Sequence, residues 1–373
     1  GLGYGVYALI KKPLLNLSKV DKYLIYSYLF YFVTFVLSLS INGGKMRDLD
    51  TASRVIFFVP VLLLLLKYPI KTCVLSYSIP LGSIISLCVA LYDKFILNLR
   101  PEQNPRIMHI QGGDISMSLG IFSLIIALYA HQKKDVKLTT LSVIGGLCGI
   151  VGSLLSTARG GWVALPILLI VILYIYRHSL SKRFFLTFFG IIVVASIGIS
   201  QMPNNRIMER IDVAQKDIQL YLDNHDGNTS LGARFEMWKS ALEMAKEKPL
   251  FGWGIQGATE KRKLDTKEKI VTGDIGQFTH AHNQYLDDLS KRGIVGLLAL
   301  LAVLFIPLRA FMKKLNTTND EVKLIATLGV AHILSVMIYG LSQGFLVHNS
   351  GTIFYFFLTI VFYAAIRTHQ KAE

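Results

Sequence analysis

The stretch FTHAHNQYLDDLSKRGIVGLLALLAVLFIPLRAFMKK, residues 278–314, joins two histidines to a long apolar run that ends at two lysines. The run at 293–312 is long enough to cross a bilayer, which needs roughly 17 to 25 apolar residues. A chain built on such runs is folded by the membrane. The side of the membrane on which the histidines lie then decides what chemistry they meet.

The composition of the whole chain is that of a membrane protein. The 373 residues are 52% hydrophobic and 17% charged, whereas soluble domains carry about 25% charged residues. The start, GLGYGVYAL, is apolar without an initiating Met, so we expect part of a further span before it. We predict an all-α polytopic membrane protein with about 10–12 transmembrane helices. Ten candidate spans lie at 23–41, 54–70, 72–92, 115–131, 138–157, 161–176, 184–201, 293–312, 322–343 and 352–366.

The charge is distributed as a membrane protein requires, although a formal net charge of +15 is also typical of nucleic-acid-binding proteins. Lysine and arginine concentrate in every second connection between spans, and the positive-inside rule makes these connections cytoplasmic. All spans then alternate in direction, so we expect membrane lipids and no nucleic acid as partners. The basic clusters are Lys11, Lys12, Lys19 and Lys22; Lys67 and Lys71; Lys133, Lys134 and Lys137; Arg177, Lys182 and Arg183; Arg309, Lys313, Lys314 and Lys323; and Arg367 and Lys371.

This orientation predicts three regions. N-terminal spans occupy 1–201, one large loop outside the cytoplasm occupies 202–292, and C-terminal spans occupy 293–373. Chemistry in water belongs to the loop or to its rim, because no other soluble part is large enough to fold.

Two helices and one charged stretch are predicted within the loop. Apolar spacing indicates an amphipathic helix over 207–221 and a second helix over 232–247, with Ser230 as a cap. The stretch EKRKLDTKEK (260–269) predicts a solvated face or a mobile loop rather than a binding site.

Two arginines have positions that local energetics do not explain. Arg159, in LLSTARGGWVALP, lies in a short connection on the side where basic residues are not favoured. It either anchors at the interface or binds a lipid phosphate through paired charge-assisted hydrogen bonds. Arg234 lies in the first turn of the predicted second loop helix, where the dipole favours an anion. Either it is a solvated charge, or it binds an anion together with the free N–H groups of that helix start.

His280 and His282 form an HxH pair whose side chains point the same way in an extended segment. A metal would need further ligands; Asp287 and Asp288 are near, but no HExxH motif or cysteine cluster accompanies them. A single imidazole suits general base catalysis at neutral pH. A helix that starts near His282 would direct this ring to the mouth of the bundle, so we favour His282 as the base and predict no metal.

Two further patterns carry less weight. Asp48 and Asp50 form a DLD like the DxD of many sugar transferases, but no GxGxxG after a strand and no Walker loop accompany it. Nucleotide-sugar chemistry is therefore not expected. His348 is a lone histidine in the last outer loop and is predicted to be structural.

Three segments then point to a family: SLLSTARGGWVALP, SLGARFEMWKSALEMAKEKPLFGWG and THAHNQYLDDLSKRGIVGL, in that order. Together they resemble the O-antigen ligase and polymerase superfamily of bacterial inner membranes. The SLGAR with a later HxHN is most similar to the O-antigen ligases of lipopolysaccharide assembly. The likeness in motif covers 140–300, and the rest of the chain is similar in hydropathy alone.

The resemblance implies a GT-C-like, multi-pass enzyme of the bacterial inner membrane with its active site facing the periplasm. It implies an inverting transfer, without metal or cofactor, of an O-antigen glycan from undecaprenyl diphosphate to a sugar hydroxyl of the lipid A–core acceptor. Arg159 and Arg234 match essential arginines and would bind the diphosphate. His282 matches an essential histidine and would be the base or a phosphate contact. Supporting roles are expected for His280, Asn283 and Tyr285.

Other activities compete with this one. An O-antigen polymerase would extend a second lipid-linked glycan, but no second arginine-rich set is present for a second diphosphate. A protein-glycosylating relative would often have a longer C-terminal region. A lipid-linked glycan flippase, which breaks no bond, should have charged residues deep within several spans, and few occur here.

Overall fold

The computed structural model describes residues 16–99, 108–157, 159–178, 180 and 206–369. Within these residues the regular structure is helical and no β-strand occurs, which confirms the predicted all-α class. The long apolar helices are α2 (Lys19–Asn42), α3 (Asp50–Lys67), α4 (Thr72–Phe95), α5 (His109–Gln132), α6 (Val136–Ser156), α7 (Arg159–Tyr176), α12 (Gln284–Met312), α13 (Asp320–Gly340) and α14 (Asn349–His369). Three more polar helices, α9 (Arg206–Asn224), α10 (Ser230–Glu247) and α11 (Ile255–Lys267), lie between α7 and α12 in the chain.

The predicted spans correspond closely to these helices. In the described part of the chain, eight helices are long and apolar enough to cross a membrane, and Gly160–Tyr176 of α7 is a shorter apolar helix. The predicted span at 184–201 lies outside the described residues. The chain is therefore a multi-pass membrane protein.

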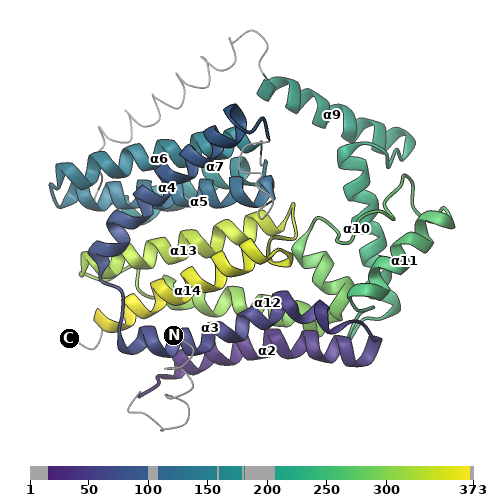
Figure 1. The fold of residues 1–373 in the computed structure, drawn as a ribbon, viewed down its shortest axis with the longest axis horizontal. Helices are drawn as coiled ribbons and strands as arrows, with labels where there is room; N and C mark the ends of the chain where they lie inside the picture. The colour runs from purple at the N-terminus through teal and green to yellow at the C-terminus, as the bar shows by residue number, and fades with distance from the viewer. Residues whose placement is uncertain (1–15, 100–107, 158, 179, 181–205, 370–373) are drawn as a thin grey trace.

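The bundle has a distinct end where the polar helices gather. Figure 1 shows the apolar helices lying side by side, with α9, α10 and α11 together at one end, which we call the loop end. The core of the bundle is α13, which packs against α5, α7, α12 and α14. Close packing of α6 on α5 depends on small residues, because a β-carbon on Gly149 would lie 2.5 Å from the Gly120 Cα.

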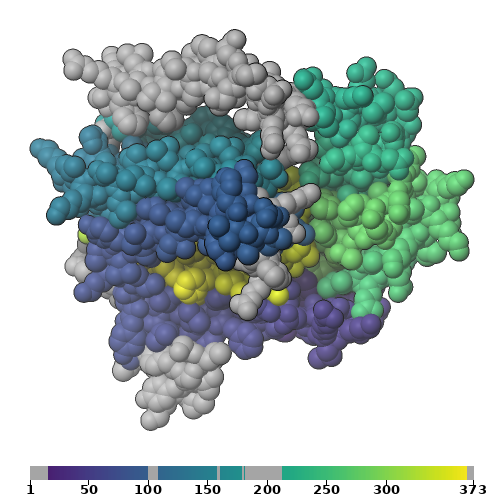
Figure 2. All heavy atoms as spheres, turned by 45° about the horizontal axis from the view of Figure 1, so that its top comes forward, coloured from purple at the N-terminus to yellow at the C-terminus, as the bar shows by residue number. Residues whose placement is uncertain are grey.

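The helices α3 and α4 follow each other in the chain but diverge in space. The first packs on α2 and α14, and the second packs on α5 and α6. Figure 2 shows the consequence, since α14 (yellow) is visible between α4 (blue) and the indigo and purple helices α3 and α2.

The helix α12 is broken at Gly293, whose backbone angles are φ 65° and ψ −163°. A side chain at this position would overlap the backbone of Leu250, so glycine is required here. The segment 249–254 fills the break with main-chain hydrogen bonds. The donor and acceptor pairs are Trp253 N to Ser290 O (2.9 Å), Gly254 N to Lys291 O (2.9 Å), Ile294 N to Pro249 O (2.8 Å) and Val295 N to Leu250 O (3.3 Å).

The loop helices confirm one prediction and correct another. Both predicted helices are present as α9 and α10, and a buried carboxylate joins them, because Glu236 accepts from the Tyr221 hydroxyl at 2.7 Å. The charged stretch at 260–269 was predicted to be a solvated face or a mobile loop. It belongs largely to α11, so it is a helix and not a loop, and most of it is the predicted solvated face, with Arg262 and Asp265 as its buried residues. The Arg262 Nη1 donates to the Phe278 carbonyl at 2.8 Å, which is why this charge is inside.

Candidate active site

The segment 278–283 enters α12 in a conformation that its neighbours hold in place. Asn283 caps the helix, because its Oδ1 accepts from the N–H groups of Tyr285 (3.0 Å) and Leu286 (3.1 Å). The Ala281 N–H donates to Asp287 Oδ1 at 2.9 Å. His282 lies between these fixed points at φ 49°, in the left-handed region that is uncommon for a side-chain-bearing residue. The predicted extended HxH segment is therefore bent at His282, and such strain is concentrated at functional sites.

His282 and Arg234 face the same cavity. It has a volume of about 320 Å³, and its polar lining also includes Asp274, Gln277 and Ser230. Burial lowers the pKa of the His282 ring, and the Arg234 charge lowers it further, against a hydrogen bond to the Gln343 oxygen that raises it. The imidazole is therefore neutral at pH 7 and can accept a proton.

The start of α10, which carries Arg234, differs from its prediction. Its cap is Thr229 instead of Ser230, since the Thr229 Oγ1 accepts from Gly232 N at 3.0 Å. The Leu231 N–H donates to an Asp217 oxygen at 3.3 Å. Two N–H groups that the sequence leaves free for an anion are thus occupied, so the Arg234 side chain is the stronger candidate for an anion contact.

Arg159 begins α7, but its side chain lies outside the described part of the structure. The backbone beside it is well placed. A β-carbon on Gly160 would lie 3.1 Å from Asp114 Oδ1 and 3.5 Å from Ser342 Oγ. The start of α7 therefore adjoins the turn that holds Gln343, the hydrogen-bond partner of His282 at 2.8 Å.

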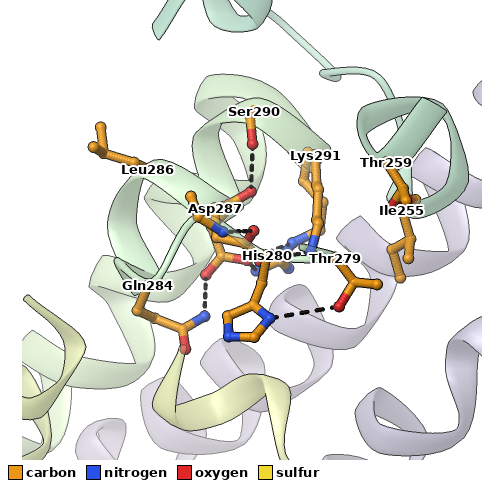
Figure 3. A network of polar contacts seen from close by, with 12 residues as sticks. Ile255, Thr259, Thr279, His280, Gln284, Leu286, Asp287, Ser290 and Lys291 are labelled. Carbon is orange, nitrogen blue, oxygen red and sulfur yellow. Dashed lines mark hydrogen bonds and ion pairs between the residues drawn. The ribbon is translucent and has the colours of Figure 1, made fainter. Parts of the chain in front are cut away.

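His280 is close to His282 but is enclosed. The two ring centroids are 4.3 Å apart, and burial, with the His282 ring second, lowers the pKa of His280 to about 3. Figure 3 shows the His280 ring between Thr279 and Gln284, with its Nδ1 3.5 Å from the Thr279 hydroxyl. His280 is thus a neutral, buried neighbour of the cavity.

The carboxylates considered as metal ligands have other partners. Asp287 Oδ2 is 2.8 Å from the Lys291 ammonium, and Asp288 forms an ion pair with Arg292. Among the described residues, no group of three or more His, Cys, Asp or Glu side chains is placed to hold a metal ion.

Other residues singled out by the sequence have structural contacts. The Tyr285 hydroxyl donates to Met337 O at 2.9 Å, which joins α12 to α13. Asp48 accepts from Gln256 Nε2 at 3.0 Å, while Asp50 pairs with the neighbouring Arg54 at 3.1 Å. Asp48 of the DLD therefore joins the turn before α3 to α11, whereas the Asp50 pair lies within α3.

Two residues of the site were not predicted. Gln343 is 1% exposed and contacts both His282 and His348. His348, predicted to be a lone structural residue, lies 5.7 Å from the His280 ring centroid to centroid. The signal for both was a short polar turn, SQGFLVHNS, between two spans on the predicted outer side.

Comparison with known proteins identifies relatives of this chain. A family model described as O-antigen ligase matches residues 144–301, which include Arg159, Arg234 and His282. An uncharacterized protein of Haemophilus influenzae is 42% identical over 357 residues, covering 96% of this chain and 89% of that protein. The exopolysaccharide production protein ExoQ of Rhizobium meliloti is 27% identical over 124 residues, which are 32% of this chain and 28% of ExoQ. The chain belongs to the O-antigen ligase and polymerase superfamily.

Proposed function

We propose that this protein transfers an O-antigen glycan from undecaprenyl diphosphate to the lipid A–core acceptor, at the periplasmic face of the bacterial inner membrane. The observation that carries the proposal is that Arg234 and His282 line one cavity, next to the turn against which α7 begins. The O-antigen ligase family supports the reaction class.

The proposed step needs no redox partner. The oxygen of an acceptor hydroxyl attacks the anomeric carbon, and the bond between that carbon and the diphosphate oxygen breaks. The hydroxyl proton passes to His282, and undecaprenyl diphosphate leaves as an anion. Attack opposite the leaving group inverts the anomeric centre.

The charges of the site suit these roles. A neutral imidazole is a competent general base at pH 7. A diphosphate needs charge stabilisation more than a proton, and guanidinium groups provide it through forked hydrogen bonds. We assign Arg234 and Arg159 to the diphosphate, and His282 to the acceptor hydroxyl.

The distribution of basic residues supports the orientation. Lys67, Lys71, Lys133, Lys313 and Lys314 flank the helix ends opposite to the loop end. By the positive-inside rule such ends are expected to be cytoplasmic, which supports a cavity on the periplasmic side.

The test is transfer by purified protein in detergent with EDTA, supplied with lipid-linked glycan and lipid A–core. We compare wild type with Arg159→Gln and His282→Asn, because asparagine tolerates a left-handed backbone. The matched controls are Lys246→Ala and His131→Ala, which change exposed residues away from the cavity. Transfer that survives EDTA and is lost only in the two site variants supports the proposal. Transfer abolished by EDTA contradicts its metal-free chemistry.

Polymer synthesis is the second candidate, because one relative carries the name exopolysaccharide production protein. It uses the same donor but a lipid-linked glycan as acceptor. Omission of lipid A–core separates the two, since a polymerase lengthens the glycan on its own carrier and a ligase forms no product.

A further inference from the structure

The turn after α13 brings a buried amide against His282. Gln343 Oε1 lies 2.8 Å from His282 Nδ1. Its Nε2 lies 3.3 Å from His348 Nε2 and 3.7 Å from Met108 Sδ. One amide thus joins three elements: the segment before α12, the segment before α14, and the residue before α5.

The contact with Met108 Sδ determines the orientation of the Gln343 side-chain amide. A side-chain amide has one oxygen that accepts and one nitrogen that donates, and their assignment must follow from the surrounding contacts. A thioether sulfur accepts and never donates. The amide nitrogen therefore faces Met108 Sδ and His348, and the oxygen faces His282.

An acceptor at Nδ1 selects one form of the imidazole. A neutral histidine carries a single ring proton, and the hydrogen bond made by one nitrogen determines where it is. Opposite the Gln343 oxygen, Nδ1 must donate, so the proton is on Nδ1. The lone pair is then on Nε2, which has no hydrogen-bond partner among the described residues.

We propose that Gln343 is a positioning residue that holds His282, which lines the cavity, in the Nδ1-protonated form, so that Nε2 is the atom left to take the acceptor proton. The inference rests on the proposed function for the direction of proton transfer. The form of the ring itself is independent of turnover. His348 and Met108 contact the amide nitrogen of Gln343. They therefore determine the orientation of the amide, which in turn determines the protonation of the His282 ring.

The first measurement reads the ring directly. Protein labelled with ¹⁵N-histidine in detergent gives separate signals for protonated and unprotonated ring nitrogens, and the spectrum of His282→Asn identifies the His282 signals. In wild type at pH 8 we expect a protonated Nδ1 and an unprotonated Nε2. In Gln343→Leu, which has similar size and no acceptor, we expect the His282 proton to redistribute between the two nitrogens. A wild-type proton on Nε2, or a distribution unchanged by Gln343→Leu, overturns the inference.

The second measurement is kinetic and separates positioning from folding. Gln343→Leu should lower kcat by about 10- to 100-fold, as loss of a group that orients a histidine does, and leave the KM for the lipid-linked donor within about 2-fold. Gln132→Leu and Gln132→Glu change an exposed glutamine at the far end of α5 and should have no effect. A KM that rises while kcat is unchanged contradicts the assigned role.

The variant Gln343→Glu distinguishes positioning from a merely structural role. A carboxylate still accepts from Nδ1–H, and its charge favours the protonated imidazole, so the acidic limb of the pH–rate profile should move up by about 1 pH unit. The other groups that act on His282 are Arg234 from α10, Asp287 from α12, and His280 and His348, and the variant leaves all four in place. Activity at pH 8 should be largely retained. Equal inactivity of the Glu and Leu variants at every pH would falsify the positioning role.

Failure of the inference differs from failure of the proposed function. If wild type transfers no glycan to any acceptor, the proposed function is wrong, and the nitrogen spectra alone decide the form of the ring. If wild type transfers glycan and Gln343→Leu does so equally well, only the present inference is wrong.

Discussion

Two polar regions lie on either side of the segment 278–283, and their side chains have different surroundings. On the α12 side, Asp287 and Asp288 are buried, and each pairs with a basic residue one turn later, Lys291 and Arg292. On the α10 side, Arg234 and His282 line an open cavity. The charges on the α12 side are paired within one helix, whereas the side chains on the α10 side border a space that a ligand can enter.

Charged side chains near the loop end therefore have two different roles in this protein. A buried ion pair contributes little net stability when intact, but its disruption leaves an uncompensated charge. Under the proposed function, the cation and the imidazole that line the cavity contribute to chemistry instead. Substitutions on the two sides should therefore separate stability from activity.

The largest effect is expected at His282. In His282→Asn, the transfer rate should fall by about 10²- to 10⁴-fold, the usual contribution of a general base. The melting temperature should stay near wild type, because the ring is only half buried. Initial rates of glycan transfer and scanning fluorimetry in detergent measure the two quantities. A melting temperature of His282→Asn well below that of wild type would show that His282 stabilises the fold, as the paired charges of α12 do.

On the α12 side we expect a loss of stability instead. Asp288→Ala leaves the Arg292 guanidinium, which is 2% exposed, without its carboxylate, at a cost of about 3–5 kcal/mol. Thermal unfolding in detergent measures this loss. The double variant Asp288→Leu with Arg292→Met, which removes both charges, should recover most of it. Asp50→Ala, which breaks the exposed pair with Arg54, should cost about 1 kcal/mol or less.

Arg234→Gln should lower kcat by about 10²- to 10³-fold, the range for loss of one group that stabilises developing charge. Folding should be unaffected, because Arg234 is only partly buried. Lys246→Ala on the same helix is the control, and it should leave both kcat and KM at the wild-type values. A rise in donor KM with kcat unchanged would limit Arg234 to ground-state binding.

The smallest effect is a shift in pH dependence. Burial and Arg234 both lower the pKa of His282, and only the neutral ring accepts a proton. The wild-type rate should therefore fall with acidity only below pH 6.5, the ordinary histidine value. Removing the Arg234 charge raises this pKa, so the residual rate of Arg234→Gln should begin to fall at a higher pH than the wild-type rate. If the acidic limb of the pH–rate profile is the same in Arg234→Gln and wild type, the Arg234 charge does not lower the pKa of His282.

Hydropathy predicted the bundle well, because the nine expected spans that lie within the described residues are all helices. It placed the start of the span in α12 at 293, the residue at which the helix is broken, and counted the turns from Gln284 to Arg292 with the loop. The first turns read as polar loop, since the pairing of Asp287 with Lys291 and of Asp288 with Arg292 neutralises charges that a hydropathy scale counts separately. The helix α11 was not predicted, because its charged residues indicate a solvated segment. The contact that buries Arg262 comes from Phe278, 16 residues away in the sequence.

The site was predictable to different degrees. Arg159, Arg234 and His282 were found because their segments resemble a family. Gln343 could not be found in this way, since its importance depends on contacts with His282, 61 residues earlier, and with Met108, 235 residues earlier. His348 was read as isolated for the same reason, because only the folded turn brings it to the other histidines.

The break in α12 at Gly293 affects which sequence changes this protein can accept. The segment 249–254 is hydrogen-bonded to the break in α12 through main-chain atoms. Substitution of most side chains in this segment therefore leaves these hydrogen bonds intact. Proline at Trp253, Gly254, Ile294 or Val295 removes a donor, and an inserted residue shifts the register. The loop can therefore change in sequence while the cavity keeps its position relative to the helix bundle.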